Sequence, residues 1–510
     1  MRLGIDFGTT HTVAALVDRG NYPVIGFEWG DTFPSVVAVA EADGALRFGP
    51  DALAAAEQPG WRLVRSFKRL LGEVGPQSRI EVAGHRFALA EILAGHFARL
   101  RDEIRERSTA AGEGDRELVV ALSVPAHASS DQRFLTLTAA REAGFQVESV
   151  LNEPSAAGFE YAHRYRRTFT SRREHVLVYD LGGGTFDVSL IHMAGLANEV
   201  VATAGVARLG GDDFDACLAA WVAERAGLGT VRGGARETLV DEVRRQKERL
   251  TPQSRRFVVD LAGLDREDVA LPVDDAYQAC RELVEQTVER VEEVVAVAAC
   301  RAGVGWEEIA SLYVVGGASS FPPVLRQLRE RYGEKRVRRS PHPYAATAIG
   351  LACTLDDASG VVLRDLLSRT FGVFRESAGG HGIAFDPIFE RDTPLPATGG
   401  GRLEVVRRYR AAHNLGHFRY LECGRLRDGV PDGTVAPWDE IRFPFDPALR
   451  ERGDLAAVPV VRLPGEGPWI EERYDCTAAG TFRVILTCLD DGWSRRYELG
   501  RRGDAVARFD

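Results

Sequence analysis

The sequence contains one local motif in two distant places, and this repeat limits the possible folds more than any other feature. In each copy an alternating apolar stretch ends at an aspartate, a short turn with glycine and threonine follows, and the alternation then resumes. The first copy is residues 6–10, Asp-Phe-Gly-Thr-Thr, and the second is residues 180–185, Asp-Leu-Gly-Gly-Gly-Thr. A period of two on both sides of each turn predicts two β-hairpins with glycine at the tip. The repetition favours a duplicated architecture.

The residue types in these turns suit a nucleotide. Glycine has no Cβ, so backbone N–H groups in the turn can approach and surround an anion. A carboxylate beside such a turn would repel a bare phosphate unless a hard cation such as Mg²⁺ lies between them, often through its waters. For a single copy, an ordinary hairpin whose glycines serve only the turn is an equally good interpretation. Two copies favour a nucleotide held between two phosphate turns.

Length and composition exclude several other classes. A chain of 510 residues is too long for one core, so two or three domains are expected. The net charge of −10 argues against a general nucleic-acid binder. The sequence shows no signal-peptide core and no apolar run of membrane-spanning length, which predicts a cytoplasmic protein without a membrane partner. Seven cysteines without metal-ligand spacing fit buried thiols in a reducing compartment, with no redox role expected.

Two polar side chains stand out near the repeats. Only three of the 64 basic residues are lysines, so Lys68, in a short helix expected over residues 66–72, attracts attention. A solvated surface lysine is the usual alternative, but a compact ammonium cannot be replaced by arginine where the geometry demands it. Glu153 precedes a proline at a strand-to-helix junction, where it could act on water or metal or simply cap the helix; the pattern alone favours the cap.

The rest of the chain divides into a helical part and a β part. Helical spacing predicts helices over 87–109, 130–143, 237–250, 275–302 and 347–355. A strand at 312–315 followed by a double glycine and a helix gives a third loop suited to a nucleoside or phosphate. Residues 356–370 are expected to form a linker, and the short alternating runs of 371–510 predict an all-β domain of the sandwich type.

Taken in order, these motifs resemble the seventy-kilodalton heat-shock chaperone family, within the actin, hexokinase and chaperone ATPase superfamily. Residues 152–154 (Asn-Glu-Pro), 209–215 (Leu-Gly-Gly-Asp-Asp-Phe-Asp) and 315–317 (Val-Gly-Gly) add to the two turns and Lys68. The resemblance covers about the first 355 residues specifically and is far weaker beyond them. It implies an α/β fold with a duplicated, actin-like two-lobed nucleotide-binding domain over 1–355. A linker over 356–370 and a C-terminal β-sandwich domain over 371–510, for substrate or partner binding, would follow.

The resemblance also implies ATP or ADP with Mg²⁺ in the cleft and assigns residues to them. Asp6 and Asp180 would hold the metal through water. The residues implied in catalysis are Lys68, Glu153, Asp180, Thr185 and Asp187. The residues implied in nucleotide binding are Asp6, Gly8, Thr9, Thr10, His11, Lys68, Gly182, Gly183, Gly184, Thr185, Gly211, Lys247, Glu248, Thr251, Gly316, Gly317, Ala318 and Ser320.

The sequence departs from the family on the adenosine side. Arg244 and Glu248 stand where the family has an acid and an arginine, so two charges have changed sign. Ser320 replaces an arginine that stacks on adenine, and Tyr344 replaces an aspartate. Losing a stacked guanidinium costs roughly 1–2 kcal/mol, which predicts weaker nucleotide binding unless Tyr344 or another arginine compensates. In the linker, Arg364 replaces a leucine, and the chain ends where the family would begin its helical lid.

Two functions are consistent with this pattern. The first is an ATP-hydrolysing, chaperone-like protein whose lidless β domain binds unfolded or extended polypeptide by strand addition, with a J-domain co-chaperone and an exchange factor as possible partners. The second is a nucleotide-dependent adaptor with weak or no ATPase activity that serves one dedicated protein client. A small-molecule kinase of the same superfamily is less favoured, because no acceptor-binding segment is evident.

Overall fold

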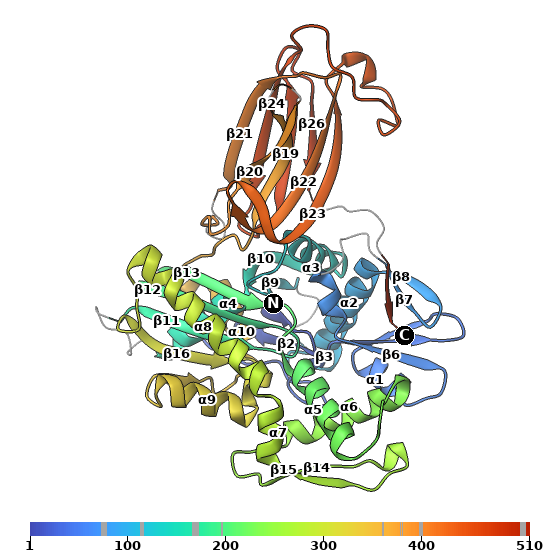
Figure 1. Ribbon diagram of the computed structural model, residues 1–510, viewed down its shortest axis with the longest axis vertical. Helices are drawn as coiled ribbons and strands as arrows, with labels where there is room; N and C mark the ends of the chain where they lie inside the picture. The colour runs from blue at the N-terminus through green and yellow to red at the C-terminus, as the bar shows by residue number, and fades with distance from the viewer. Residues whose placement is uncertain are drawn as a thin grey trace.

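The computed structural model describes residues 1–72, 79–112, 117–165, 173–194, 197–359, 362–377, 379, 381–396, 401–499 and 506–509. Two α/β lobes lie side by side at the base, and a β domain stands above them (Figure 1). The mixed α/β fold with two lobes and a C-terminal β region confirms the predicted fold class. Val361, which the sequence places in the linker, lies outside the described residues.

The first lobe is built on a five-stranded sheet in the order β10-β9-β1-β2-β3. Its strands are β1 (Arg2–Phe7), β2 (His11–Leu16), β3 (Phe33–Pro34), β9 (Val119–Val124) and β10 (Gln146–Asn152). β1 and β2 form the first predicted hairpin, while β9 runs parallel to both β1 and β10. Helix α2 (Leu89–Arg107) buries its apolar stripe, from Leu89 to Ile104, and α3 (Ser130–Glu142) packs against it.

The second lobe repeats this arrangement. Its sheet has the order β17-β16-β11-β12-β13-β18. The strands are β11 (His175–Leu181), β12 (Phe186–Ala194), β13 (Ala197–Val206), β16 (Ile309–Val315), β17 (Val337–Arg339) and β18 (Val362–Arg364). β11 and β12 form the second predicted hairpin, and β11 pairs in parallel with β16 as β1 does with β9. The duplication inferred from the two turns is therefore present in the strand order itself.

Two helices pack together where the lobes join. These are α4 (Glu153–Tyr165), which follows β10, and α10 (Ala346–Leu355). A Cβ on Gly350 of α10 would lie 1.8 Å from the carbonyl oxygen of Ala156 in α4, and one on Gly4 of β1 would lie 2.2 Å from that of Ala348. Glycine at these two positions permits a backbone approach that no other residue allows.

Five further helices complete the second lobe. They are α5 (Gly211–Arg225), α6 (Gly233–Glu248), α7 (Val273–Ala279), α8 (Arg281–Ala302) and α9 (Pro322–Tyr332). The single helix predicted over 275–302 is in fact α7 and α8. The break falls at Cys280, whose φ of −91° and ψ of 2° end one helix and begin the next. The apolar periodicity continues through the break, so the pattern could not reveal it.

Smaller elements surround the two lobes. In the first lobe these are β4 (Val36–Ala40), β5 (Leu46–Phe48), α1 (Pro50–Ala56), β6 (Trp61–Arg65), the 3₁₀ helix η1 (Phe67–Gly72), β7 (Arg79–Val82) and β8 (His85–Ala88). In the second lobe they are β14 (Arg256–Val259), β15 (Val269–Pro272) and the 3₁₀ turns η3 (Ala262–Leu264), η4 (Gly317–Ser320) and η5 (Asp357–Ser359). Lys68 thus lies in a 3₁₀ helix, in the stretch where a short helix is expected.

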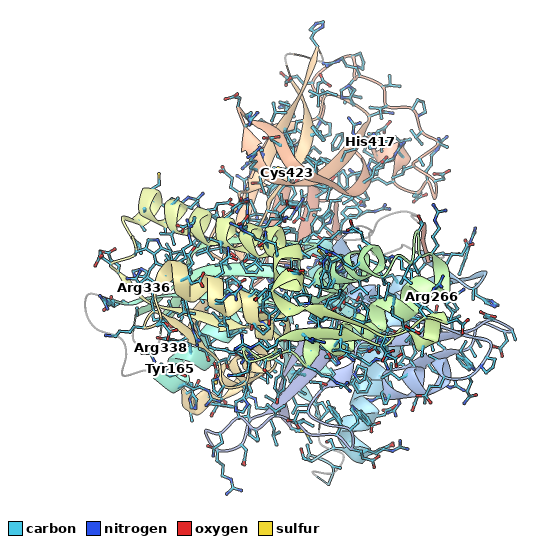
Figure 2. The ribbon with its side chains drawn as sticks, turned by 60° about the horizontal axis from the view of Figure 1, so that its bottom comes forward. Tyr165, Arg266, Arg336, Arg338, His417 and Cys423 are labelled. Carbon is cyan, nitrogen blue, oxygen red and sulfur yellow. The ribbon has the colours of Figure 1, made fainter. Side chains whose placement is uncertain are left out.

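The upper domain is a sandwich of two four-stranded sheets, β20-β19-β22-β23 and β21-β24-β25-β26. Its buried core is rich in aromatic rings, including Phe371, Trp438 and Phe482. Cys423 and His417, both on β22, mark this domain in the second view (Figure 2). The strands are β19 (Thr370–Ser377), β20 (Gly382–Phe389), β21 (Leu403–Arg410), β22 (Leu415–Arg427), β23 (Val430–Pro444), β24 (Trp469–Cys476), β25 (Phe482–Cys488) and β26 (Ser494–Glu498).

One strand near the end of the chain leaves this sandwich. β27 (Val506–Phe509) pairs in parallel with β7 of the first lobe rather than with the β domain. In Figure 1 it lies beside β7 and β8, far from the sandwich strands. Residues 506–509 of the expected 371–510 domain are thus placed on the first lobe.

The segment between the lobes and the β domain is held against the lobes. β18 adds a parallel strand to the free edge of β13. Just after it, the buried carboxylate of Asp365 accepts hydrogen bonds from the backbone N–H of Asn152 at 3.1 Å and from its Nδ2 at 2.6 Å. Arg133 donates to the Asn152 side-chain oxygen and to the Ala479 carbonyl oxygen. The connecting segment therefore contacts both lobes, and Arg133 of the first lobe reaches the β domain at Ala479.

Candidate functional site

The two glycine turns meet directly. An ideal Cβ on Gly183 would lie 2.5 Å from Cγ2 of Thr10, and one on Gly184 would lie 2.5 Å from Cγ2 of Thr9. Each hairpin thus brings its tip against the tip of the other, and any side chain on these glycines would push them apart. The turns that the sequence repeats are adjacent in space.

A cavity of about 490 Å³ opens beside this contact, between the two lobes. Asp6 and Asp180, the two aspartates that end the repeated strands, both line it. Sixteen other predicted residues also line it; they belong to both turns, to Lys68 and Glu153, to the third glycine loop, and to helices α5 and α6. The predicted residues in the lining are Asp6, Gly8, Thr9, Thr10, His11, Lys68, Glu153, Asp180, Gly182, Gly183, Thr185, Gly211, Lys247, Glu248, Gly316, Gly317, Ala318 and Ser320.

Three predicted residues are not part of this lining. Gly184 lies behind Thr9, in contact with it. Asp187 is buried behind the second turn, where its Oδ1 accepts from the backbone N–H of Ala126 at 3.0 Å and lies 2.9 Å from Nδ1 of His127. Thr251 is exposed beyond the end of α6 and its side chain contacts Ser254. Asp187 can therefore act only through its neighbours.

The cavity is also lined by residues that were not among the binding residues predicted from the sequence. Asp212 and Asp215 belong to the 209–215 motif, which the sequence analysis had already singled out, and could have been found from it. The apolar and first-lobe members come from segments without any distinguishing pattern. The unassigned lining residues are Val13, Thr32, Pro34, Ser35, Val36, Leu53, Arg65, Ser66, Asp212, Asp215, Arg244, Leu250, Phe321, Pro343, Tyr344 and Thr347.

Lys68 is held beneath the first turn. Its Nζ donates to the Phe7 carbonyl oxygen and, at 2.8 Å, to Oε1 of Glu153. The lysine side chain is only 6% exposed, and its ammonium lies 5.3 Å from the centre of the Phe7 ring. A lysine this deeply buried and paired is not a solvated surface cation, so the surface alternative for Lys68 is wrong.

The carboxylates around Lys68 carry more negative charge than this single cation balances. Burial raises the pKa of Glu153 to about 7, although Lys68 opposes the shift. Burial also raises the pKa of Asp6, which accepts a hydrogen bond of 2.6 Å from Ser123 Oγ. The pKa of Asp180 is raised well above its usual value by burial and by the charges of Glu153 and Asp6. A bound cation would lower all three values.

These carboxylates suit a hydrated divalent cation better than a fully protein-bound one. Among the described residues, no group of three or more His, Cys, Asp or Glu side chains is arranged to ligate a metal directly. Mg²⁺ usually keeps several waters and is held by one or two carboxylates together with phosphate oxygens. Asp6 and Asp180, facing one cavity from opposite lobes, provide that donor set.

On the opposite wall of the cavity, the basic side chains already form ion pairs with aspartates. Lys247 Nζ lies 2.6 Å from Asp215 Oδ1 and donates to the Gly211 carbonyl oxygen at 3.0 Å. Arg244 donates to Asp215 at 2.8 Å and to Asp212 at 3.2 Å. The Arg244 guanidinium therefore neutralises Asp212 and Asp215 in α5 and does not face the cavity unpaired.

Two side chains from distant segments, Arg339 and Asp31, contact residues of this wall without lining the cavity themselves. Arg339 of β17 donates from Nη2 to Ser320 Oγ at 2.5 Å, so a guanidinium lies beside Ser320. Tyr344 donates through its hydroxyl to Asp31 Oδ2 at 3.2 Å and thereby links the two lobes across the cavity mouth. The sequence singled out Ser320 and Tyr344, but the contributions of Arg339 and Asp31 depend on tertiary structure.

Two duplicated α/β lobes that close paired glycine turns on one cavity, followed by a β-sandwich, define the class: the chain belongs to the Hsp70 family. The family model described as Hsp70 protein matches residues 2–412. The chain is 30% identical to the chaperone protein DnaK of Thermosipho africanus over 85% of its own length and 75% of that protein. It is 33% identical to the chaperone protein HscA of Serratia proteamaculans, over 77% of this chain and 64% of that one. The resemblance drawn from the motifs is confirmed.

None of the helices within the described ranges combines the length and the apolar character needed to cross a membrane.

Proposed function

We propose that this protein is an ATP-driven, chaperone-type member of the Hsp70 family. It binds and slowly hydrolyses MgATP in the cavity between the lobes and transmits the nucleotide state to polypeptide binding by the β domain. The observation that carries the proposal is the convergence of both glycine turns, Lys68 and Glu153 on one cavity. Phosphoryl transfer to water depends chiefly on positioning and charge neutralisation, which such a cavity provides.

Each group in the cavity has a defined task in this proposal. The backbone of residues 8–10 and 182–185 and the threonine hydroxyls bind phosphate oxygens. Lys68 neutralises charge on the transferred phosphate and fixes the attacking water. Glu153, with a pKa of about 7, accepts the proton of that water near neutral pH. Asp6 and Asp180 would hold Mg²⁺, which supplies further charge neutralisation when bound.

Coupling between the domains follows from the contacts of Asn152. This residue precedes Glu153 in the chain, and its backbone and side chain both donate to Asp365 in the connecting segment. A movement of Glu153 with the state of the nucleotide would therefore reach the segment that carries β18. We assign residues 1–355 to the nucleotide-binding domain, 356–370 to the connection and 371–510 to polypeptide or partner binding by strand addition.

The partners follow from this assignment. The named relatives are chaperones, and we propose that this chain likewise takes unfolded or extended polypeptide. A J-domain protein would stimulate hydrolysis and an exchange factor would release the nucleotide, in the cytoplasm. The net charge of −10 keeps nucleic acid out of the proposal.

Single-turnover hydrolysis of ATP by wild type and by Lys68→Ala tests the proposal. We expect turnover in the wild type, stimulation by an extended peptide together with a J-domain protein, and loss of turnover in the variant. Lys335→Ala is the matched control, because Lys335 is an exposed lysine outside the cavity lining. Turnover that is absent, or equal in Lys68→Ala and wild type, would contradict the proposal.

A second candidate is the nucleotide-dependent adaptor with weak or no ATPase activity. The observation that favours it is the pairing of Arg244 and Lys247 with Asp215, which leaves fewer free donors for an adenosine moiety. Under this alternative, ATP binds without turnover, and the β domain retains one protein partner whether or not nucleotide is present.

A further inference from the structure

A histidine and an aspartate from different lobes meet behind the second glycine turn. His127 lies in the turn that follows β9 of the first lobe, and Asp187 lies on β12 of the second lobe, just after Thr185 and Phe186. Nδ1 of His127 is 2.9 Å from Oδ1 of Asp187. The same oxygen accepts a hydrogen bond of 3.0 Å from the backbone N–H of Ala126. Two donors from the first lobe therefore hold one carboxylate oxygen of the second.

The backbone opposite Asp187 leaves room for the imidazole ring. Gly205 of β13 is the cross-strand partner of Asp187. A Cβ on Gly205 would lie 2.6 Å from Nδ1 of His127 and 2.8 Å from Oδ1 of Asp187. Side chains do not pack this closely, so glycine at this position is what allows the ring and the carboxylate to meet. The contact thus depends on three segments that the fold brings together.

The carboxylate is enclosed, and few groups orient it. The side chain of Asp187 is 1% exposed and that of His127 is 26% exposed. Among the described residues, none hydrogen-bonds the other carboxylate oxygen, Oδ2. Buried polar groups take their orientation from the partners that they have. Within the described structure, the N–H of Ala126 and the imidazole of His127 are therefore the donors that fix this side chain.

Charged groups from three segments act on His127. Burial lowers the pKa of His127, but the charge and the hydrogen bond of Asp187 outweigh burial, with a further contribution from the charge of Glu153 on α4. The charge of Arg369 in the connecting segment acts in the opposite direction, and the pKa is raised on balance. A neutral ring beside a carboxylate still carries its proton on Nδ1 and donates it. The contact therefore persists in both protonation states.

We propose that His127 is a positioning residue for ATP hydrolysis, which fixes Asp187 and with it the second phosphate turn against the first lobe. His127 does not line the cavity itself. Asp187 is the cross-strand partner of Asp180 in the β11–β12 hairpin, whose tip is the phosphate turn. Loss of the donor would let the hairpin shift, and a displacement of about 1 Å can lower a rate by about 100-fold. This inference rests on the proposed function.

Variants of His127 in the full chain test the role of the imidazole. His127→Leu removes the donor, so single-turnover hydrolysis of ATP should fall about tenfold, while the calorimetric ATP affinity should change less than about threefold. His127→Asn places an amide N–H near the position of Nδ1 and should recover most of the lost rate. His192→Leu is the matched control, because His192 also lies on β12, pairs with Glu174 at 3.3 Å and is outside the cavity lining; it should change neither quantity.

Two further measurements test the contact without altering His127. In Gly205→Ala the new methyl group displaces the ring, so turnover should fall as it does in His127→Leu. The double variant should be no slower than the slower single variant, because both changes break the same contact. By NMR titration without nucleotide, Asp187→Asn should lower the pKa of His127 by about one pH unit or more, and the pKa of His192 should stay unchanged.

Several outcomes would overturn the inference. Turnover of His127→Leu equal to that of the wild type would do so and would leave the proposed function intact. So would an equal loss of rate and ATP affinity, or a natively folded His127→Asn as slow as His127→Leu, because either result would show that the donor does not position the turn. A pKa of His127 that is unchanged in Asp187→Asn would show that the pair does not form in solution. A wild type without turnover would overturn the proposed function and this inference together.

Discussion

The two ends of the cavity differ in how close together in the sequence their functional residues lie. At the phosphate end, every feature comes from short stretches of sequence: two glycine turns, an aspartate before each, and Lys68 with Glu153. At the other end, where we propose that adenosine binds, Arg244 is paired with Asp215, and Arg339 of the distant strand β17 donates to Ser320. We infer that the phosphate end sets turnover and that the adenosine end sets only modest differences in affinity.

The largest expected effect is at Lys68. Replacing this buried lysine by alanine removes the cation that forms a salt bridge with Glu153, so hydrolysis should fall by about 100-fold or more. Nucleotide affinity should change much less. Single-turnover rates and calorimetric affinities, measured on the same preparations, separate the two quantities. An equal loss of rate and affinity would show that the lysine only binds.

The next largest effect is expected for Asp180→Asn, which should weaken MgATP binding but stabilise the nucleotide-free protein. Asp180→Asn should weaken MgATP binding by about tenfold or more, because one of two carboxylates facing the metal is lost. The free energy of unfolding of the nucleotide-free protein should rise at pH 8, since the variant no longer buries a charge whose pKa is raised by burial. Denaturant titration and calorimetry measure the two. Asp18→Asn, at an exposed position, should change neither.

A smaller effect concerns the pH dependence of stability without nucleotide. Glu153 has a folded pKa of about 7 against an ordinary 4.5, so the folded state binds more protons than the unfolded state between these values. The free energy of unfolding should therefore fall as pH rises through this window. Glu153→Gln should reduce the fall between pH 5 and pH 8 by about 1–3 kcal/mol. A slope identical to that of the wild type would contradict the raised pKa.

The smallest effect is expected at the adenosine end. Arg339→Ala should weaken ATP binding by only about two- to fivefold, the value of an exposed stacked or hydrogen-bonded guanidinium. Arg338→Ala is the matched control, because this neighbour lies 5.5 Å from the Tyr165 ring, away from Ser320; both Arg338 and Tyr165 are labelled in Figure 2. A loss of 100-fold for Arg339→Ala would reverse the contrast between the two ends.

The contrast also explains what could be predicted from the sequence. The duplicated hairpins, the two lobes and the β-sandwich follow from local periodicity and turn chemistry, which act over a few residues. The contacts of Asp31 with Tyr344 and of Arg339 with Ser320 could not be predicted, because they depend on which distant segments meet. The break at Cys280 was missed because the apolar spacing of 275–302 fits one helix as well as two. The site assignments themselves stay predictions until nucleotide is seen.

The most direct test of the central claim is a crystal structure with ATP and Mn²⁺ in place of Mg²⁺, with anomalous diffraction used to locate the metal. The account predicts one anomalous peak between Asp6 and Asp180, with the phosphates between residues 8–10 and 182–185. A nucleotide or metal bound elsewhere, with this cavity containing only solvent at saturating ligand, would contradict it.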